Sequence, residues 1–285
     1  MNKVAILTDS TANIPSEIIS QYNVISVPLE IIWGKEVFED GVTLQPTEFY
    51  QRLVKAKELP TTSQPAVGKF SKILQELVAR EFDVLGIFFS SKLSGTYQSA
   101  MQAMEMLPEE ERKHVSLLDS QTTTLAMGFQ ILAAARLAET GGSLNECQAT
   151  ATYVRENSGI YFMVDTLEFL QRGGRIGKAQ RFLGTALGTK PILYMNNGEI
   201  TPLDRVRTKQ KALDYLVDIV VEKCDAKKQI RLVCAHANSP EDARNVLTKA
   251  SDILHPVEAL SGDLSPVIGS HVGPGTIALG FSTGI

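Results

Sequence analysis

The sequence has few cysteines, and their spacing excludes two kinds of stabilising site. Only three occur among 285 residues, at Cys147, Cys224 and Cys234. The number is odd and no pair has the Cys-x-x-Cys spacing, so we expect neither a disulfide framework nor a structural zinc site. Such usage is typical of a reducing compartment. We therefore expect a cytoplasmic protein without a metal centre.

Long hydrophobic runs are also missing. No run approaches the roughly 18 apolar residues that are needed to cross a membrane. The apolar run near the N-terminus covers only Val4 to Leu7, whereas a signal peptide needs a longer run and a small-residue cleavage site. These features predict a soluble protein with no membrane span.

The sequence has no excess of basic residues. Lys and Arg total 28 against 32 Asp and Glu, which gives a formal net charge of −4 at pH 7. An extended nucleic-acid surface needs a basic excess on one face, so we expect no nucleic-acid partner. The 21 Gly and 12 Pro are too few for a collagen-like or low-complexity chain. With 44% hydrophobic and 21% charged residues, the chain is predicted to be globular, with one large or two ordinary domains.

The first half of the chain alternates short apolar runs with segments of helical period. Strands are predicted at residues 4–8, 84–89 and 115–118. One helix is predicted to begin at Pro65, and another to run from about 123 to 140. Apolar strands that alternate with helices indicate a mainly parallel sheet covered on both faces, which makes three layers. Residues 24–41 do not fit this pattern and predict a strand or hairpin excursion.

The pattern changes after Gly159. Asn196-Asn197-Gly198 lies between two apolar runs, and Asn-Gly in this position is the strongest short-range signal for a hairpin. Further strands are predicted at 160–164, 230–235 and 276–281, and helices at 209–224 and 239–250. We expect a two-layer α/β domain with a mixed sheet here. A boundary near Ser158 gives an N-terminal α/β domain at 1–158 and a C-terminal one at 159–285.

The sequence contains no complete nucleotide-binding motif. Gly177-Lys178 lacks the earlier glycine and the following hydroxyl of a phosphate-binding loop, because Arg172 and Ala179 occupy those places. Residues 273–278 have the glycine spacing of a dinucleotide motif, but that motif opens a helix, whereas we expect a strand at 276–281. Any chemistry that needs ATP would therefore need a partner.

Three hydroxyl-rich clusters lie at predicted strand ends or helix starts. They are Thr61-Thr62-Ser63-Gln64-Pro65, the segment from Ser90 to Thr96, and Asp119-Ser120-Gln121-Thr122. Each alone could be a plain helix cap, because Ser, Thr and Asp are preferred caps. Their joint placement favours a binding site, since ligands of a parallel sheet lie outside the carboxyl ends of its strands. Hydroxyls and helix N-termini there suit a carboxylate or a phosphate.

Two further segments are candidates for the same chemistry. His271 lies among glycines between Gly269 and Gly275, where the backbone can approach a ligand closely, although a lone histidine is often structural. The segment from Arg172 to Lys178 places three cations on a glycine-rich turn, as a helix C-cap or as a contact for an anion or an acidic partner. Arg207 belongs to a second basic spot, which is either a solvated helix start or a docking point.

Five motifs occur together in an order that resembles the DegV family, the fatty-acid-binding proteins of bacterial fatty acid kinase. They are Leu7-Thr8-Asp9-Ser10-Thr11, Thr62-Ser63-Gln64-Pro65, Ser94-Gly95-Thr96-Tyr97, Arg172-Gly173-Gly174-Arg175-Ile176 and His271-Val272-Gly273-Pro274-Gly275. The resemblance spans essentially the whole chain.

The resemblance implies a two-domain α/β protein with one long-chain fatty acid in a tunnel between the domains. Thr62, Ser94 and His271 would bind the carboxylate, with the Gly95 backbone nearby. Arg172, Arg175 and Arg207 would contact the partner or the transferred phosphate. A separate ATP-binding kinase subunit would phosphorylate the acid to an acyl phosphate, so this chain would be a non-catalytic subunit without a cofactor.

Two alternatives stay open at this point. The chain could be a self-sufficient hydrolase or transferase that uses Ser94 with His271. Such a nucleophile needs a base and usually a third, orienting group, for which the sequence offers Asp9 or Asp119. The chain could also be a fatty-acid carrier without a kinase partner.

Overall fold

The computed structural model describes residues 2–22, 24–184, 188–225 and 227–284. Its first half is built on a parallel sheet with the strand order β2-β1-β6-β7. These strands are β1 (Lys3–Asp9), β2 (Val24–Val27), β6 (Phe82–Phe88) and β7 (Val115–Asp119). The central strands β1 and β6 are almost entirely buried, because helices cover both faces of the sheet.

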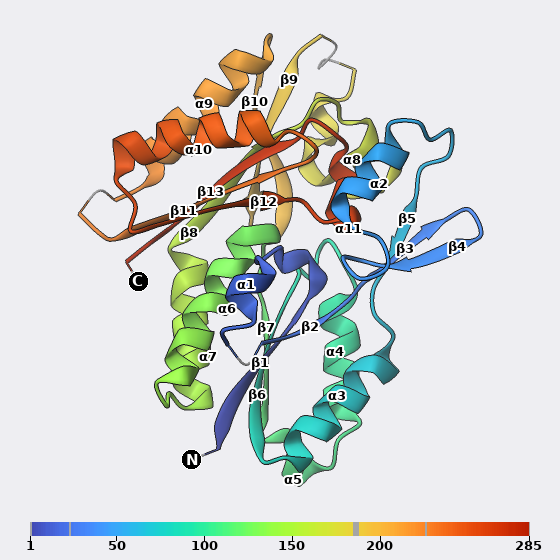
Figure 1. Cartoon of the computed structure of the whole chain (residues 1–285), viewed down its shortest axis with the longest axis vertical. Helices are drawn as coiled ribbons and strands as arrows, with labels where there is room; N and C mark the ends of the chain where they lie inside the picture. Colours follow the sequence, from blue (N-terminus) through green and yellow to red (C-terminus); the bar gives the residue numbers. More distant parts are fainter. Residues whose placement is uncertain (1, 23, 185–187, 226, 285) are drawn as a thin grey trace.

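Two pairs of helices make the outer layers of this half (Figure 1). Helices α3 (Val67–Ala79) and α4 (Thr96–Glu105) pack on one face through a cluster that includes Leu7, Phe70 and Phe88. Helices α6 (Thr124–Glu139) and α7 (Leu144–Glu156) pack on the other through a cluster that includes Ile6 and Leu85. Short segments complete it: η1 (Ser10–Ala12), α1 (Ser16–Ile19) and α5 (Glu109–Arg112). The predicted three-layer arrangement is confirmed.

A small antiparallel sheet projects from this half. It has the order β4-β3-β5, from β3 (Glu30–Trp33), β4 (Glu36–Glu39) and β5 (Thr61–Ser63). Helix α2 (Pro46–Leu53) lies between β4 and β5 in the sequence. The predicted hairpin is therefore confirmed, although Val24–Val27 at its predicted start joins the parallel sheet. The helix expected from Pro65 begins two residues later, because the chain first pairs as β5 and Ala66 is still extended.

The second half contains a six-stranded mixed sheet with the order β10-β9-β8-β13-β11-β12. Its strands are β8 (Ser158–Met163), β9 (Lys190–Asn196), β10 (Glu199–Val206), β11 (Ile230–His236), β12 (Glu258–Asp263) and β13 (Ile277–Thr283). Only β11 and β12 pair in parallel among these strands. The predicted hairpin is β9–β10, turned by Asn197 and Gly198, both at positive φ.

Helices α9 (Lys209–Lys223) and α10 (Pro240–Leu254) cover the outer face of the mixed sheet. The fold class is thus confirmed as α/β, with a parallel three-layer part and a mixed-sheet part. Strand β12 and helix α11 (Pro266–Val272) were not predicted, whereas α8 (Glu168–Arg172) and η2 (Gly177–Phe182) are helical segments that flank the glycine-rich turn, as expected. The mixed sheet begins at Ser158, and the boundary at 158/159 stays a prediction. Within the described residues, no helix is long and apolar enough to cross a membrane.

The two halves meet at the largest apolar cluster, which includes Phe49, Phe89 and Phe129 from the first half and Phe162 and Val267 from the second. A buried carboxyl group, Asp40, also joins them. It accepts hydrogen bonds from the Ser10 hydroxyl (2.7 Å) and from the backbone N–H of Val267 at the start of α11 (3.3 Å). Burial raises the pKa of Asp40 to about 7.

The raised pKa of Asp40 predicts how stability depends on pH. Between about pH 4 and pH 7 the unfolded chain releases this proton while the folded chain keeps it, so the free energy of unfolding falls as pH rises through this window. The fall is up to about 4 kcal/mol. Asp40→Asn removes the effect, and its stability relative to wild type should improve from pH 4 to pH 7 in urea unfolding.

The exposed Asp252→Asn serves as the matched control, and its stability should follow wild type across the same range. If the Asp40→Asn and wild-type curves run parallel, Asp40 is ionised in the folded protein and this assignment is wrong.

Candidate functional site

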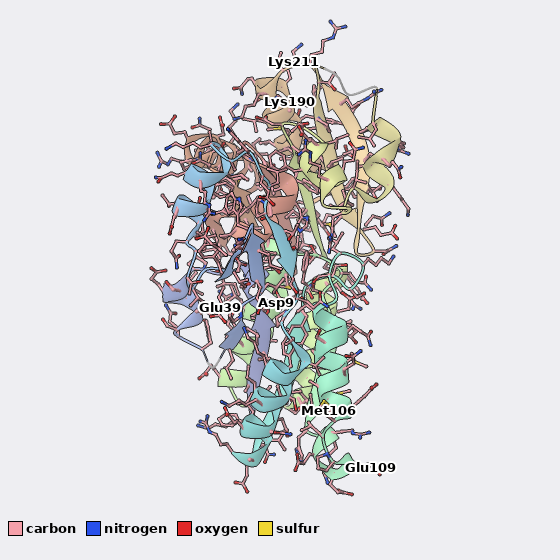
Figure 2. All side chains as sticks on the ribbon, turned by 90° about the vertical axis from the view of Figure 1, so that its right-hand side faces the viewer. Asp9, Glu39, Met106, Glu109, Lys190 and Lys211 are labelled. Atoms are coloured by element: carbon pink, nitrogen blue, oxygen red, sulfur yellow. The ribbon has the colours of Figure 1, made fainter. Side chains whose placement is uncertain are left out.

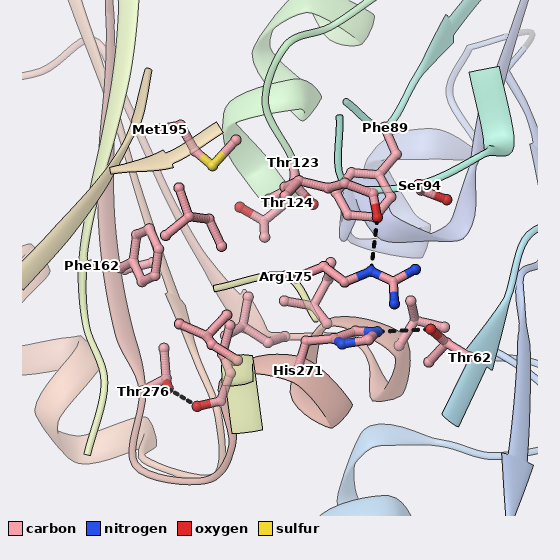
Figure 3. Close-up of a pocket in the computed structure, with 18 of the residues that line it drawn as sticks. Thr62, Phe89, Ser94, Thr123, Thr124, Phe162, Arg175, Met195, His271 and Thr276 are labelled. Carbon is pink, nitrogen blue, oxygen red and sulfur yellow. Dashed lines mark hydrogen bonds between the residues drawn. The ribbon is translucent and has the colours of Figure 1, made fainter. Parts of the chain in front are cut away.

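A pocket lies between the two halves, and most of its wall is apolar. About 770 Å³ between its side chains is free of protein atoms, a volume that includes the open mouth. The apolar wall includes Phe89, which follows β6, Ile160 and Phe162 of β8, Met195 of β9 and Ile268 of α11. Residues from both halves thus enclose one space (Figure 3).

Thr62 and His271 meet at one end of this pocket. The Thr62 hydroxyl on β5 lies 2.8 Å from Nε2 of His271 on α11, although 209 residues separate them in sequence. Helix α11 is held in place from its start, where the Tyr50 hydroxyl donates to the carbonyl of Leu264 (3.0 Å) and Asp40 accepts from Val267. The antiparallel pairing of β5 with β3 brings Thr62 to the same point.

The imidazole of His271 is neutral at physiological pH. Burial lowers its pKa to about 4, and the positive charge of Arg175 acts in the same direction. A neutral imidazole has one N–H donor and one acceptor nitrogen. Its Nδ1 is buried and has no hydrogen-bond partner among the described residues. The ring can therefore offer one hydrogen bond but no positive charge.

Ser94 and Gly95 lie in the loop between β6 and α4. Ser94 lines the pocket, and its Oγ lies 2.9 Å from Oγ1 of the fully buried Thr96. Gly95 is not part of the pocket wall. It packs closely on the side chain of Gln64, and Gln64 does line the pocket. The Ser94 hydroxyl is thus held by Thr96 at the pocket wall.

Arg175 supplies the positive charge at this end of the pocket. Its Nε donates to the carbonyl of Leu93 (3.1 Å), and its Nη1 donates to the carbonyl of Gly173 (2.6 Å). Leu93 precedes Ser94, and Gly173 touches the ring of His271. One guanidinium group therefore ties the loop that carries Ser94 to the turn that supports His271. We call Thr62, Ser94, Arg175 and His271 the polar end of the pocket.

The other two predicted arginines lie elsewhere. Arg172 is largely exposed and forms an ion pair with Glu168 (2.8 Å), and Arg207 is exposed just after β10. Neither is part of the pocket wall. The binding roles predicted for Thr62, Ser94, Gly95 and His271, and the partner or phosphate contacts predicted for the arginines, stay predictions.

The geometry does not support the alternative of a Ser–His nucleophile. The Ser94 hydroxyl pairs with Thr96, and the His271 ring pairs with Thr62. Asp9 accepts hydrogen bonds from Thr11 and from the backbone of Phe89, while Asp119 accepts from Ser91 and Gln121. Within the described parts of the chain, no carboxylate bonds to His271, so the third member of a triad is not in place.

Sequence reasoning missed two parts of the site. Gly173 is one, because a Cβ atom at this position would lie 2.2 Å from Nδ1 of His271. The paired glycines of 173–174 were a visible signal, which was interpreted only as a helix end. Thr123 and Thr124 are the other, because they line the pocket across from His271. They directly follow the cluster that ends at Thr122.

Comparisons with known proteins agree with one another. A model of the DegV family, described as a family of uncharacterised proteins, matches residues 3–284. Protein DegV of Bacillus subtilis is 35% identical over 281 residues, which are 97% of this chain and 98% of that protein. The solved structure of a DegV family protein from Thermus thermophilus, described by its fatty acid binding, is 34% identical with a TM-score of 0.92 and 99% coverage of both chains. A stearic acid-binding protein from Eubacterium ventriosum is 26% identical with a TM-score of 0.90, covering 99% of this chain and 98% of its own.

The contact between Gly173 and His271 generates a direct test. Gly173→Ala should push the imidazole away from Thr62, because the added methyl group has no room beside Nδ1. The ¹⁵N NMR shifts of the His271 ring, which report its tautomer and hydrogen bonds, should change. Gly68→Ala is the matched control, since a methyl group there meets nothing within 4 Å. Unchanged His271 signals in Gly173→Ala would contradict the assigned contact.

Proposed function

The chain belongs to the DegV family, and we propose that it binds one long-chain fatty acid in the pocket between its two halves. One observation carries the proposal. A cluster of neutral hydrogen-bonding groups and a single cation, the polar end, closes a pocket whose remaining wall is mostly apolar. This is the pattern that a carboxylate with a long alkyl tail requires. The relatives described as fatty acid binding support it.

The tail and the carboxylate make different contributions in this proposal. Burial of an acyl chain is worth about 0.8 kcal/mol per methylene, so a long tail supplies most of the affinity. A hydrogen bond to a charged group is worth roughly 1.5–3 kcal/mol. The carboxylate accepts such bonds from Thr62 and Ser94, and from His271 once the ring exchanges its bond to Thr62 for one to the ligand, beside the backbone of Gly95 and the charge of Arg175. The polar end therefore mainly orients the acid.

We further propose that the bound acid is presented to a separate ATP-dependent kinase subunit in the cytoplasm. A carboxylate oxygen would attack the γ-phosphorus of ATP, forming the acyl phosphate as the bond to the β-phosphate oxygen breaks and ADP leaves. This chain has no phosphate-binding loop of its own. The exposed Arg172 adjoins the turn that supports His271 and is the first candidate for the partner contact, with Arg207 as the second.

The ligand is tested first. Native mass spectrometry of protein purified from cells, followed by organic extraction, should yield a long-chain fatty acid near one to one. Delipidated protein should rebind stearate. Recovery of only traces, together with failure to rebind any long-chain acid, would remove the basis for a fatty-acid site.

If the tail supplies the affinity and the polar end orients the carboxylate, substitutions in the polar end should affect binding and phosphorylation differently. Ser94→Ala and His271→Ala should each weaken fatty-acid binding by roughly ten- to a hundredfold, as the loss of one hydrogen bond to a charged group predicts. At saturating fatty acid, partner-dependent acyl phosphate formation should still fall by about a hundredfold or more, because in-line attack needs an oriented oxygen. The measurement pairs bound lipid with turnover in the presence of the kinase subunit from the same cell.

Ser91→Ala is the matched control, because Ser91 lies in the same loop but bonds to Asp119 outside the pocket. Turnover by the isolated chain, or equal losses of binding and turnover in the two variants, would overturn the proposed division. No turnover with any kinase subunit would leave a carrier.

A further inference from the structure

Two threonine hydroxyls face the pocket without a partner. Thr123 and Thr124 both line it, and Figure 3 shows them across from His271. Their Oγ1 atoms are buried and form no hydrogen bond with any described residue. Thr124 is only 2% exposed as a whole. The pocket therefore has polar groups on a second side, away from the polar end.

These threonines start α6, a helix of 16 residues. Thr123 occupies the capping position, but its hydroxyl does not cap the helix. The first N–H groups of a helix have no partner within it, and the positive end of its dipole lies there. The two hydroxyls therefore lie at the positive end of the α6 dipole.

Another threonine of the pocket wall, Thr276, behaves differently. Its hydroxyl donates to the carbonyls of Val272 and Gly273, at 3.0 Å each. Buried hydroxyls nearly always have a partner. A plain alkyl chain cannot supply one to Thr123 and Thr124, because it has neither a donor nor an acceptor.

We propose that Thr123 and Thr124 form a second polar contact that recognises an oxygen substituent, a hydroxyl or an oxo group, on the chain of the bound fatty acid. The proposal rests on the fatty-acid function proposed above and narrows its ligand class to oxygenated fatty acids. The carboxylate lies at the polar end, and the substituent lies beside the start of α6. An oxygen there accepts from the hydroxyls, and a hydroxyl group can also donate to them.

The test compares stearate with a series of hydroxystearates and oxostearates that differ in the substituted carbon. Wild-type protein, delipidated first, should bind at least one positional isomer about three- to tenfold more tightly than stearate, as one or two neutral hydrogen bonds allow. Thr123→Val and Thr124→Val keep the shape of the side chain and remove the hydroxyl. Each should reduce this preference, while stearate affinity stays the same or rises.

Thr123→Ser and Thr124→Ser are the matched controls, because they retain the hydroxyl and should retain the preference. If Thr124→Val does not fold, because Thr124 has a positive φ of 56°, Thr123→Val carries the test. Stearate binding with no preference for any isomer would overturn the second contact while leaving the fatty-acid function intact. Binding of neither stearate nor any substituted acid would overturn both proposals.

Discussion

The hydrogen bond between Thr62 and His271 depends on the placement of α11, and most of the site depends on that placement. This helix of seven residues is too short to be stable alone. It is held by contacts from the first half, where Tyr50 donates to the carbonyl before it and Asp40 accepts from its first turn. The pocket is therefore a property of the contact between the halves, since neither half contains a complete polar end.

The placement of α11 also explains why the imidazole of His271 is neutral. The ring packs on Gly173, whose carbonyl accepts from Arg175, so the cation and the imidazole share one support. Burial and the nearby positive charge both oppose protonation of the ring. A ligand carboxylate at the polar end would meet one full positive charge together with neutral donors. Such a site can fix the direction of a carboxylate oxygen and leave the tail to determine occupancy.

Much of this was visible in the sequence, because it depends on local pattern. Strand alternation, the Asn197-Gly198 turn and the order of the motifs predicted the fold class and placed Thr62, Ser94 and His271 among the candidates. Helix α11 and strand β12 were missed, since seven and six residues are too few for a clear period. Hydroxyl clusters could not be sorted into caps and pocket groups, because the partner of a hydroxyl is set by tertiary packing. Thr62 proves to lie on a strand rather than at a helix start.

The structure also distinguishes two arginines of the same turn that the sequence could not tell apart. Arg172 and Arg175 are three positions apart, yet Arg172 extends into solvent while Arg175 spans Leu93 and Gly173. Because Arg175 bonds to both carbonyls, its charge is fixed in the pocket wall and is suited to a ligand rather than to a partner. Arg172 has only an exposed ion pair, which is weak in water, so an acidic partner surface could displace Glu168 at little cost. The proposed functions of lipid binding and partner docking thus fall on neighbouring residues that point in different directions.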